Sequence, residues 1–172
     1  EPSIFIDDCR ESLLDAGVEL LEGRGVSSLN IRDGEVNSIA LSDGKEIRAE
    51  RYILSAGAWT REILYRHGIQ LMTIIITCYA YRLDLGDDLG LPSFSDEWLH
   101  SYWRPWGTEL VGGGYDADFS DAPDISDAPP PKKYIENSIK LLHRRVRLKS
   151  PPRLTGTLRG PCSVTADMEP II

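Results

Sequence analysis

The sequence lacks the features that mark membrane spans, disulfide frameworks and zinc sites. Its longest apolar run, residues 71–81 of 172, contains two threonines and is far shorter than the roughly 20 residues of a membrane helix. The three cysteines, Cys9, Cys78 and Cys162, lie far apart and form no CxxC pair. This spacing is typical of reduced thiols, so we predict a cytoplasmic protein with no membrane span and no metal centre.

Positive charge is also scarce. Lys and Arg number 19 against 27 Asp and Glu, which gives a formal net charge of -8. A duplex-binding surface has to neutralise phosphates, so this balance argues against a nucleic-acid partner. Because 41% of the residues are hydrophobic, the chain can form a core, and we predict one folded domain or one and a part.

Hydrophobic spacing predicts an α+β fold. Helical spacing is found in residues 4–16, 60–67 and 132–148, and residues 18–21 are a possible short strand. Asp33-Gly34 and Asp43-Gly44 separate the β-rich runs 26–31, 35–41 and 45–54, which predicts a β-meander. Further strands are predicted over residues 71–83, 99–104, 109–115 and 154–158. Residues 116–131 contain four of the 11 prolines and predict an exposed loop.

Two short motifs suggest ligand sites but depart from the required patterns. The acidic stretch that begins at Asp116 has Asp121 in the sixth position and Asp127 in the twelfth, where an EF-hand needs Gly and Glu. The run Gly112-Gly113-Gly114 lacks the context of a phosphate-binding loop. We therefore expect no calcium loop, and a bulge or a close backbone approach at the glycines.

One polar row could bind a ligand. His100, Tyr102 and Arg104 alternate along a predicted strand, so their side chains would share one face. A row of this composition suits an anionic ligand, and it would equally suit the solvent face of a sheet. The pattern alone leaves both interpretations open.

Two segments together are more specific. The meander ends in Tyr52-Ile53-Leu54-Ser55-Ala56-Gly57-Ala58-Trp59, which is similar to the pattern "dG..i.Ad.vVlAaGAW". Residues 160–172, GPCSVTADMEPII, are similar to the pattern "G.y.vTPD..PiI". Both patterns belong to the FAD-dependent amino-acid and amine oxidoreductases, a family that includes D-amino-acid oxidase, sarcosine oxidase, glycine oxidase and dye-linked proline dehydrogenase. The two segments occur in the family's order and at about its spacing, so the resemblance covers nearly the whole chain.

The sequence departs from the family pattern at several points. The family's opening strand, GxGxxG turn and helix are not in this sequence, nor is the glycine-rich segment that follows "PiI". Ala166 replaces the proline of "TPD", and Ile75 stands near the proline of a "PvrGq" strand. We expect the chain to be an internal portion of such an enzyme. Without the GxGxxG turn to donate N–H groups to the pyrophosphate, it should bind FAD weakly or not at all.

The resemblance implies a partial FAD/NAD(P)-binding-type flavoprotein fold, a β-meander plus an antiparallel substrate-domain sheet with flanking helices. Residues 1–70 would belong to the FAD-binding domain, 71–158 would form the substrate-binding domain, and 159–172 would return to the FAD-binding domain. The implied reaction oxidises the C–N bond of an amino acid or secondary amine by hydride transfer to flavin N5, which gives an imine that water hydrolyses.

The resemblance also implies site residues, although no catalytic residue is assigned. A guanidinium or a tyrosine hydroxyl would bind the substrate carboxylate. The implied substrate contacts are His100, Tyr102, Arg104 and Arg159. The implied FAD contacts are Val26, Ala56, Gly57 and Trp59. Cys162 lies two residues away from the position of the cysteine that binds flavin covalently in some sarcosine oxidases.

Two alternatives stay open. The first is a flavin-free binding or interaction module derived from this fold, alone or as a subunit completed by a partner chain. The same fold could instead act on a 2-hydroxy acid or on glycerol phosphate. In either case a truncated sheet exposes apolar surface and strand edges, so we also expect self-association.

Overall fold

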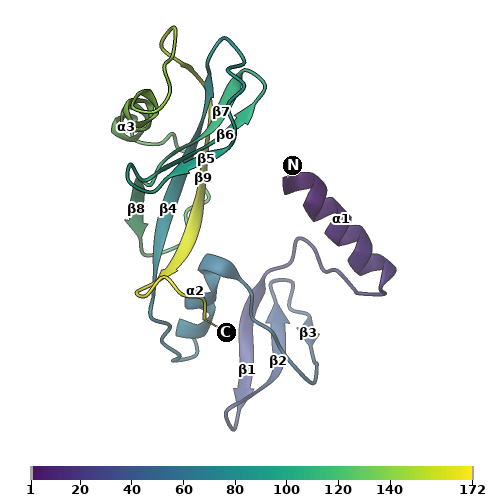
Figure 1. Ribbon diagram of the computed structural model, residues 1–172. Coiled ribbons are helices and arrows are strands. Elements are labelled where there is room, and N and C mark those ends of the chain that lie inside the picture. Colours follow the sequence, from purple (N-terminus) through teal and green to yellow (C-terminus); the bar gives the residue numbers. More distant parts are fainter. Residues whose placement is uncertain (1, 172) are drawn as a thin grey trace. The chain divides into compact units, whose positions relative to one another are not determined.

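The structure is a computed structural model that describes residues 2–171 (Figure 1). The chain divides into two compact units, Glu1–Ile53 and Leu54–Ile172. The assignment of residues 1–70 and 159–172 to an FAD-binding domain, and of residues 71–158 to a substrate-binding domain, stays a prediction. Residues 159–165 continue a long strand of the second unit, because they remain in register with its central strand.

The first unit begins with the helix α1 (Pro2–Asp15), as the helical spacing predicts. The helix is followed by Gly17 at a φ of 79°, a left-handed conformation that favours glycine. Its apolar side chains are exposed, between 43% and 69%, at Ile4, Phe5, Ile6, Leu13 and Leu14. The possible strand at residues 18–21 is wrong, since this segment is irregular.

The predicted β-meander is confirmed. The strands β1 (Val26–Arg32) and β2 (Glu35–Leu41) are antiparallel, and Asp33 and Gly34 between them both have positive φ, as a type I′ turn requires. The third strand, β3 (Glu46–Ile47), is much shorter than the predicted run 45–54. Beyond it the Tyr52 hydroxyl accepts a hydrogen bond from the Ala49 N–H and donates one to the Asn37 carbonyl, so a side chain takes the place of strand pairing there.

The second unit opens with the turn η1 (Gly57–Trp59) and the short helix α2 (Thr60–Tyr65), and then forms a six-stranded antiparallel sheet (Figure 1). Its strands are β4 (Thr73–Asp84), β5 (Phe94–Asp96), β6 (Ser101–Trp106), β7 (Glu109–Gly114), β8 (Ala117–Ser120) and β9 (Arg153–Thr165). The central strand β4 pairs with β9 along one edge for its whole length. Along its other edge it pairs with β8 through residues 75–78 and with β7 through residues 81–84.

The core of the second unit lies between this sheet and the helix α3 (Lys132–His143). Its fully buried members come from β4, β6, β7 and α3, among them Tyr81, Leu83, Trp103, Leu110 and Leu142. The helix is shorter than the predicted 132–148, but a hydrogen bond from the Val146 N–H to the Leu142 carbonyl continues the turn. Val146 therefore still belongs to the core, as the helical spacing indicates.

Two predicted boundaries are wrong. Residues 117–120 form β8 inside the segment expected to be a loop, because they pair with residues 75–78 of β4. Asp118 of this strand also accepts hydrogen bonds from the hydroxyls of Tyr79 and Tyr134, both at 2.7 Å. The last strand extends to Thr165 rather than ending at 158. Pro161 is tolerated there because β9 lies at the edge of the sheet and pairs only with β4.

The close backbone approach predicted at the three glycines is confirmed. A Cβ on Gly112 would lie 1.9 Å from the carbonyl oxygen of Tyr102 on the neighbouring strand. The N–H of Gly114 donates a hydrogen bond to the Ser138 hydroxyl of α3 at 2.9 Å. The absence of side chains lets β7 lie directly against β6 and α3.

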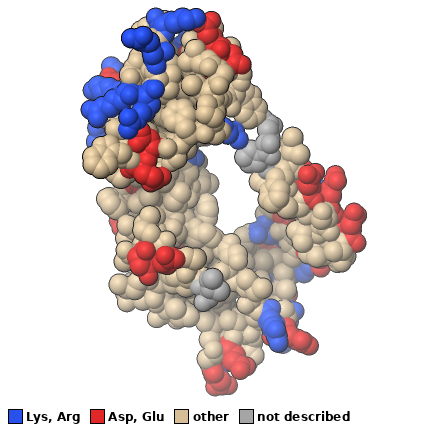
Figure 2. Space-filling view, viewed as in Figure 1, with Lys and Arg blue, Asp and Glu red and all other residues tan. Residues whose placement is uncertain are grey.

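Basic side chains gather around α3 and the segment that follows it (Figure 2). Arg145 forms an ion pair with Asp96, and Lys149 with Asp87 at 2.8 Å. The helix carries Lys140 and His143 in its last turn, where the helix dipole favours cations. These contacts are typical of a solvated helix end.

Candidate functional site

The sheet of the second unit has one covered face and one exposed face. Along β4 the residues Ile75, Thr77, Tyr79, Tyr81 and Leu83 are buried on the face that packs against α3. The alternating residues point to the other side, which we call the open face. Its side chains include Ile74, Ile76, Cys78 and Arg82 of β4, Tyr102, Arg104 and Trp106 of β6, Phe119 of β8, and Leu158, Cys162 and Val164 of β9.

The structure brings Tyr102 and Arg104 of β6 to this face, whereas His100 lies in the turn before β6 at a φ of 50°, outside the strand in which it was predicted to align with them. In β6, Trp103 is buried whereas Tyr102 and Arg104 are exposed, as the alternation requires. The ring of Tyr115 contacts both the His100 ring, at 5.8 Å between centroids, and the Tyr102 ring, at 6.1 Å. Burial raises the pKa of Tyr102, so its hydroxyl stays protonated and can donate a hydrogen bond.

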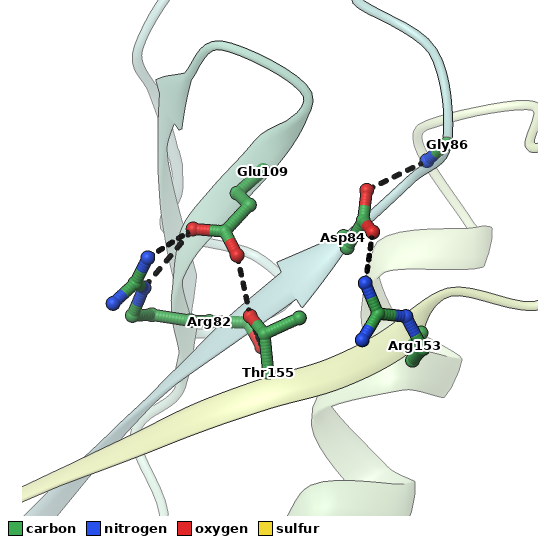
Figure 3. Close-up of polar contacts among 6 residues, drawn as sticks. All are labelled: Arg82, Asp84, Gly86, Glu109, Arg153 and Thr155. Atoms are coloured by element: carbon green, nitrogen blue, oxygen red, sulfur yellow. Dashed lines mark hydrogen bonds and ion pairs between the residues drawn. The ribbon is translucent and has the colours of Figure 1, made fainter.

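The arginines in the strands of the large sheet differ in whether a carboxylate neutralises them. Arg82 forms an ion pair with Glu109, whose other oxygen accepts a hydrogen bond from Thr155, and Arg153 forms an ion pair with Asp84 (Figure 3). These contacts lower the pKa of Glu109, first through the hydrogen bond from Thr155 and then through that from Arg82.

Arg159 lies on the covered face, away from Tyr102 and Arg104. It is in register with Tyr79, and its guanidinium stacks over the Tyr79 ring at 5.7 Å from the centroid. It forms an ion pair with Asp124 and donates a hydrogen bond to the Ala128 carbonyl, which ties the 121–131 segment to β9. The structure therefore does not join Arg159 to the other three predicted substrate contacts.

Arg104 is the remaining strand arginine of this sheet. Its guanidinium lies over the Trp106 ring at 5.2 Å, and within residues 2–171 no carboxylate forms an ion pair with it. A cation that stacks on an aromatic ring keeps its N–H edges available to a ligand. The open face thus contains one uncommitted guanidinium, beside the Tyr102 hydroxyl.

A cavity of about 840 Å³ lies at the other end of the sheet, between the segment 54–73 and the segment 163–171. Its walls include Leu54, Gly57, Leu64, Leu71, Val164, Met168 and Ile171. Thr73 also lines it and has a buried hydroxyl without a hydrogen-bond partner among the described residues. A cavity of this size, with mostly apolar walls and a few polar groups, is typical of a small-molecule or cofactor site.

This cavity fits the ring end of a flavin better than its pyrophosphate end. The apolar walls suit a flat ring system, and the unpaired Thr73 hydroxyl can hydrogen bond to a heteroatom on it. The donors that hold a pyrophosphate come from a GxGxxG turn, which the sequence does not contain.

The predicted cofactor contacts are distributed over both units. Gly57 lines the cavity at a φ of 53°, and Ala56 precedes it in the turn. Trp59 ends the same turn and is 42% exposed. Val26 is the first residue of β1 in the first unit.

Several residues of these sites were missed by the sequence analysis. Tyr115 follows the glycine run, and it could have been placed beside Tyr102 by extending the β6–β7 register past Gly114. Thr73, Ser163 and Thr165 of the cavity gave no signal, because hydroxyl residues are ordinary in strands.

Two kinds of site are missing from the described residues. Within 2–171, no group of three or more His, Cys, Asp or Glu side chains is arranged to hold a metal ion. None of the described helices has the length and apolar character needed to cross a membrane.

Comparisons with known proteins show the family and the fold. The family model described as FAD dependent oxidoreductase, DAO, matches residues 1–172. Similar solved structures include glycine oxidase from Geobacillus kaustophilus, at 20% identity and a TM-score of 0.65 over 91% of this chain and 40% of that one. L-proline dehydrogenase from P. horikoshii has 16% identity and a TM-score of 0.74 over 90% of this chain and 41% of that one.

Iminodiacetate oxidase from Chelativorans sp. BNC1 has 22% identity and a TM-score of 0.73 over 92% of this chain and 42% of that one. At these identities the likeness shows the fold, and the predicted α+β flavoprotein fold is confirmed. The chain spans about two fifths of the length of these three structures. No curated protein matches the sequence.

Proposed function

Because the chain belongs to the family of FAD-dependent oxidoreductases, we propose that the complete protein oxidises the carbon–nitrogen bond of an amino acid or a secondary amine. In this proposal the open face of the second unit binds the substrate. The cavity beside Gly57 receives the flavin ring.

The observation that supports a carboxylate-bearing substrate is the state of Arg104. Arg82, Arg153 and Arg159 are each held by a carboxylate, whereas Arg104 has only the Trp106 ring as a partner among the described residues. A guanidinium binds a carboxylate through two parallel hydrogen bonds, which fixes the orientation of the ligand as well as attracting it. An anionic group of the substrate is therefore the partner that Arg104 fits best.

Neighbouring groups would complete the binding. The protonated Tyr102 hydroxyl can donate a further hydrogen bond to the carboxylate. The ring of Tyr115 contacts the rings of both Tyr102 and His100, which holds the Tyr102 ring in place. The apolar part of the substrate would lie on exposed Phe119 and Leu158 of the same face. Bound FAD would supply the acceptor for the hydride that leaves the carbon next to nitrogen.

A binding experiment tests the carboxylate site without requiring turnover. We would measure N-methylglycine binding to the purified chain by saturation-transfer NMR and compare it with dimethylamine, which has no carboxylate. The substitution Arg104→Gln should weaken N-methylglycine binding by at least about tenfold, because a hydrogen-bonded charge of this kind contributes roughly 1.5–3 kcal/mol. The matched control is Arg153→Gln. Because Arg153 is already paired with Asp84, this substitution should leave N-methylglycine binding unchanged.

Three outcomes would contradict this proposal. They are equal binding of dimethylamine, unchanged binding after Arg104→Gln, or no binding of N-methylglycine at all. Lactate and glycerol phosphate are included as ligands because they represent the alternative substrate classes. Tighter binding of either one than of N-methylglycine would reassign the substrate and retain the role of Arg104.

FAD binding by this chain is a separate measurement. We expect little flavin absorbance to remain after FAD is added and the excess removed, because the pyrophosphate has no GxGxxG turn to bind. Stoichiometric retention would contradict this expectation. Amine binding without any flavin affinity, even in a longer form of the protein, would instead favour the alternative of a flavin-free binding module.

A further inference from the structure

Two of the three cysteines lie next to each other on the open face, a placement that the sequence does not suggest. Cys78 is in β4 and Cys162 is in β9, 84 positions later in the chain. Cys162 is in register with Ile76, and Cys78 with Gly160. Because residues in register share a face and alternate residues return to it, both thiols point to the same side of the sheet.

The thiols are close enough to interact. Burial and, after it, a hydrogen-bonding interaction with the Cys162 thiol together raise the pKa of Cys78 to about 11. Both thiols also raise the pKa of the Tyr102 hydroxyl, whose side chain lies on the same open face. Cys162 is exposed, and no atom lies within 4 Å of where a Cβ on Gly160 would be, so the space next to Cys78 is open.

The relation between the two residues is diagonal rather than directly opposite. Diagonal neighbours in an antiparallel pair are about 7–8 Å apart, whereas an unstrained disulfide needs Cα atoms within about 4.4–6.8 Å. A direct S–S bond would therefore require a shift of the strands. A single atom placed between the sulfurs would bridge them without such a shift.

We propose that Cys78 and Cys162 form a two-thiolate site for a soft monovalent cation, with Cu(I) as its representative. Thiolates select Cu(I) over hard cations, and a d¹⁰ ion of this charge accepts two sulfur ligands in a nearly linear arrangement. Zinc would need four ligands, and the described residues contain no cluster of three or more candidate ligands. The site does not depend on the proposed oxidation, since it uses neither Arg104 nor the cavity.

Binding replaces two S–H bonds by two S–Cu bonds, and both protons pass to the buffer. No oxidant is required, because copper enters and remains in its monovalent state. Because the ion displaces both thiol protons, its affinity should increase as the pH rises from 6 to 8. Tyr102 is the other titratable group coupled to the pair, and its raised pKa keeps it neutral over this range.

The test is an anaerobic titration of the purified full chain with Cu(I) in competition with bicinchoninate, which forms a coloured Cu(I) complex. We expect one tightly held ion per chain. Cys78→Ser and Cys162→Ser should each weaken this binding by at least about tenfold, since each removes half of the ligand set. Cys9→Ser is the matched control, because Cys9 is a free, exposed thiol on α1 and should have no effect.

A footprint on the unmodified chain covers the case in which a variant fails to fold. Bound Cu(I) should protect Cys78 and Cys162 from iodoacetamide while Cys9 continues to react. Unchanged affinity in either serine variant, equal protection of Cys9, or no ion bound would overturn the proposal. So would rapid formation of a Cys78–Cys162 disulfide in the native fold under mild oxidation, because the diagonal geometry would then not keep the sulfurs apart.

Discussion

The contact between Gly112 and the carbonyl of Tyr102 gives a sharp prediction, because it joins the core of the second unit to its open face. In Gly112→Ala the added Cβ would lie 1.9 Å from the Tyr102 oxygen and 2.9 Å from the Trp103 Cα. Contacts below 3.0 Å are essentially never found for a Cβ, so β6 and β7 have to separate by about 1 Å in a close-packed region.

The expected cost is about 3 kcal/mol or more in the free energy of unfolding. Overpacking against movable side chains costs roughly 1–3 kcal/mol, and here the obstacle is backbone on a paired strand. The matched control is Gly160→Ala on β9, where nothing lies within 4 Å of the new Cβ. Replacement of glycine at a compatible position stabilises by about 0.4–1 kcal/mol, so the two variants should differ by more than about 3 kcal/mol.

Tryptophan fluorescence in urea is a suitable assay. The four tryptophans, Trp59, Trp98, Trp103 and Trp106, all belong to the second unit, so the signal reports on that unit alone. Trp103 is 2% exposed and adjoins the substitution, which makes its emission sensitive to separation of the strands. If Gly112→Ala unfolds within about 0.5 kcal/mol of Gly160→Ala, the packing argument is refuted.

Two further predictions concern the covered face. Leu142→Ala should lower the free energy of unfolding by about 2–5 kcal/mol in the same urea assay, because the side chain is fully buried in the core; a loss below about 1 kcal/mol would contradict this. Hydrogen bonds from Tyr134 and Tyr79 lower the pKa of Asp118, so its contribution is present above the unfolded pKa near 4 and is lost as the pH falls through the lower folded pKa. Asp118→Asn should therefore flatten the dependence of stability on pH below about 4, relative to the control Asp127→Asn, and parallel curves would disprove it.

Much of the fold follows from local signals in the sequence. The Asp33-Gly34 turn required positive φ at both positions, and the structure has it. The alternation of Tyr102, Trp103 and Arg104 placed two of these side chains on one face, and β6 follows that alternation. Such features depend on a few neighbouring residues, so no tertiary information is needed to predict them.

The features that the sequence did not predict depend on pairing between distant strands. The face occupied by Arg159 is set by its register with Tyr79, across 80 positions of chain. The strand β8 lies in the acidic segment that was predicted to be a loop, where it pairs with β4 and its Asp118 accepts hydrogen bonds from two tyrosine hydroxyls. The adjacency of Cys78 and Cys162 also depends on the β4–β9 register. A one-residue change in that register would have moved Arg159 and Cys162 to the opposite face.

The shared register of β4 and β9 also has a consequence for how this sequence can vary over evolution. The side chains of β4 point alternately to the covered face and to the open face, and β9 pairs with β4 along its full length. Strand β9 has one extra residue between the partners of Arg82 and Leu83, and this irregularity lies near one end of the β4–β9 pair. Insertions and deletions among homologues should thus be excluded from residues 73–81 and 157–165, and should accumulate in the connections at 85–93 and 121–131.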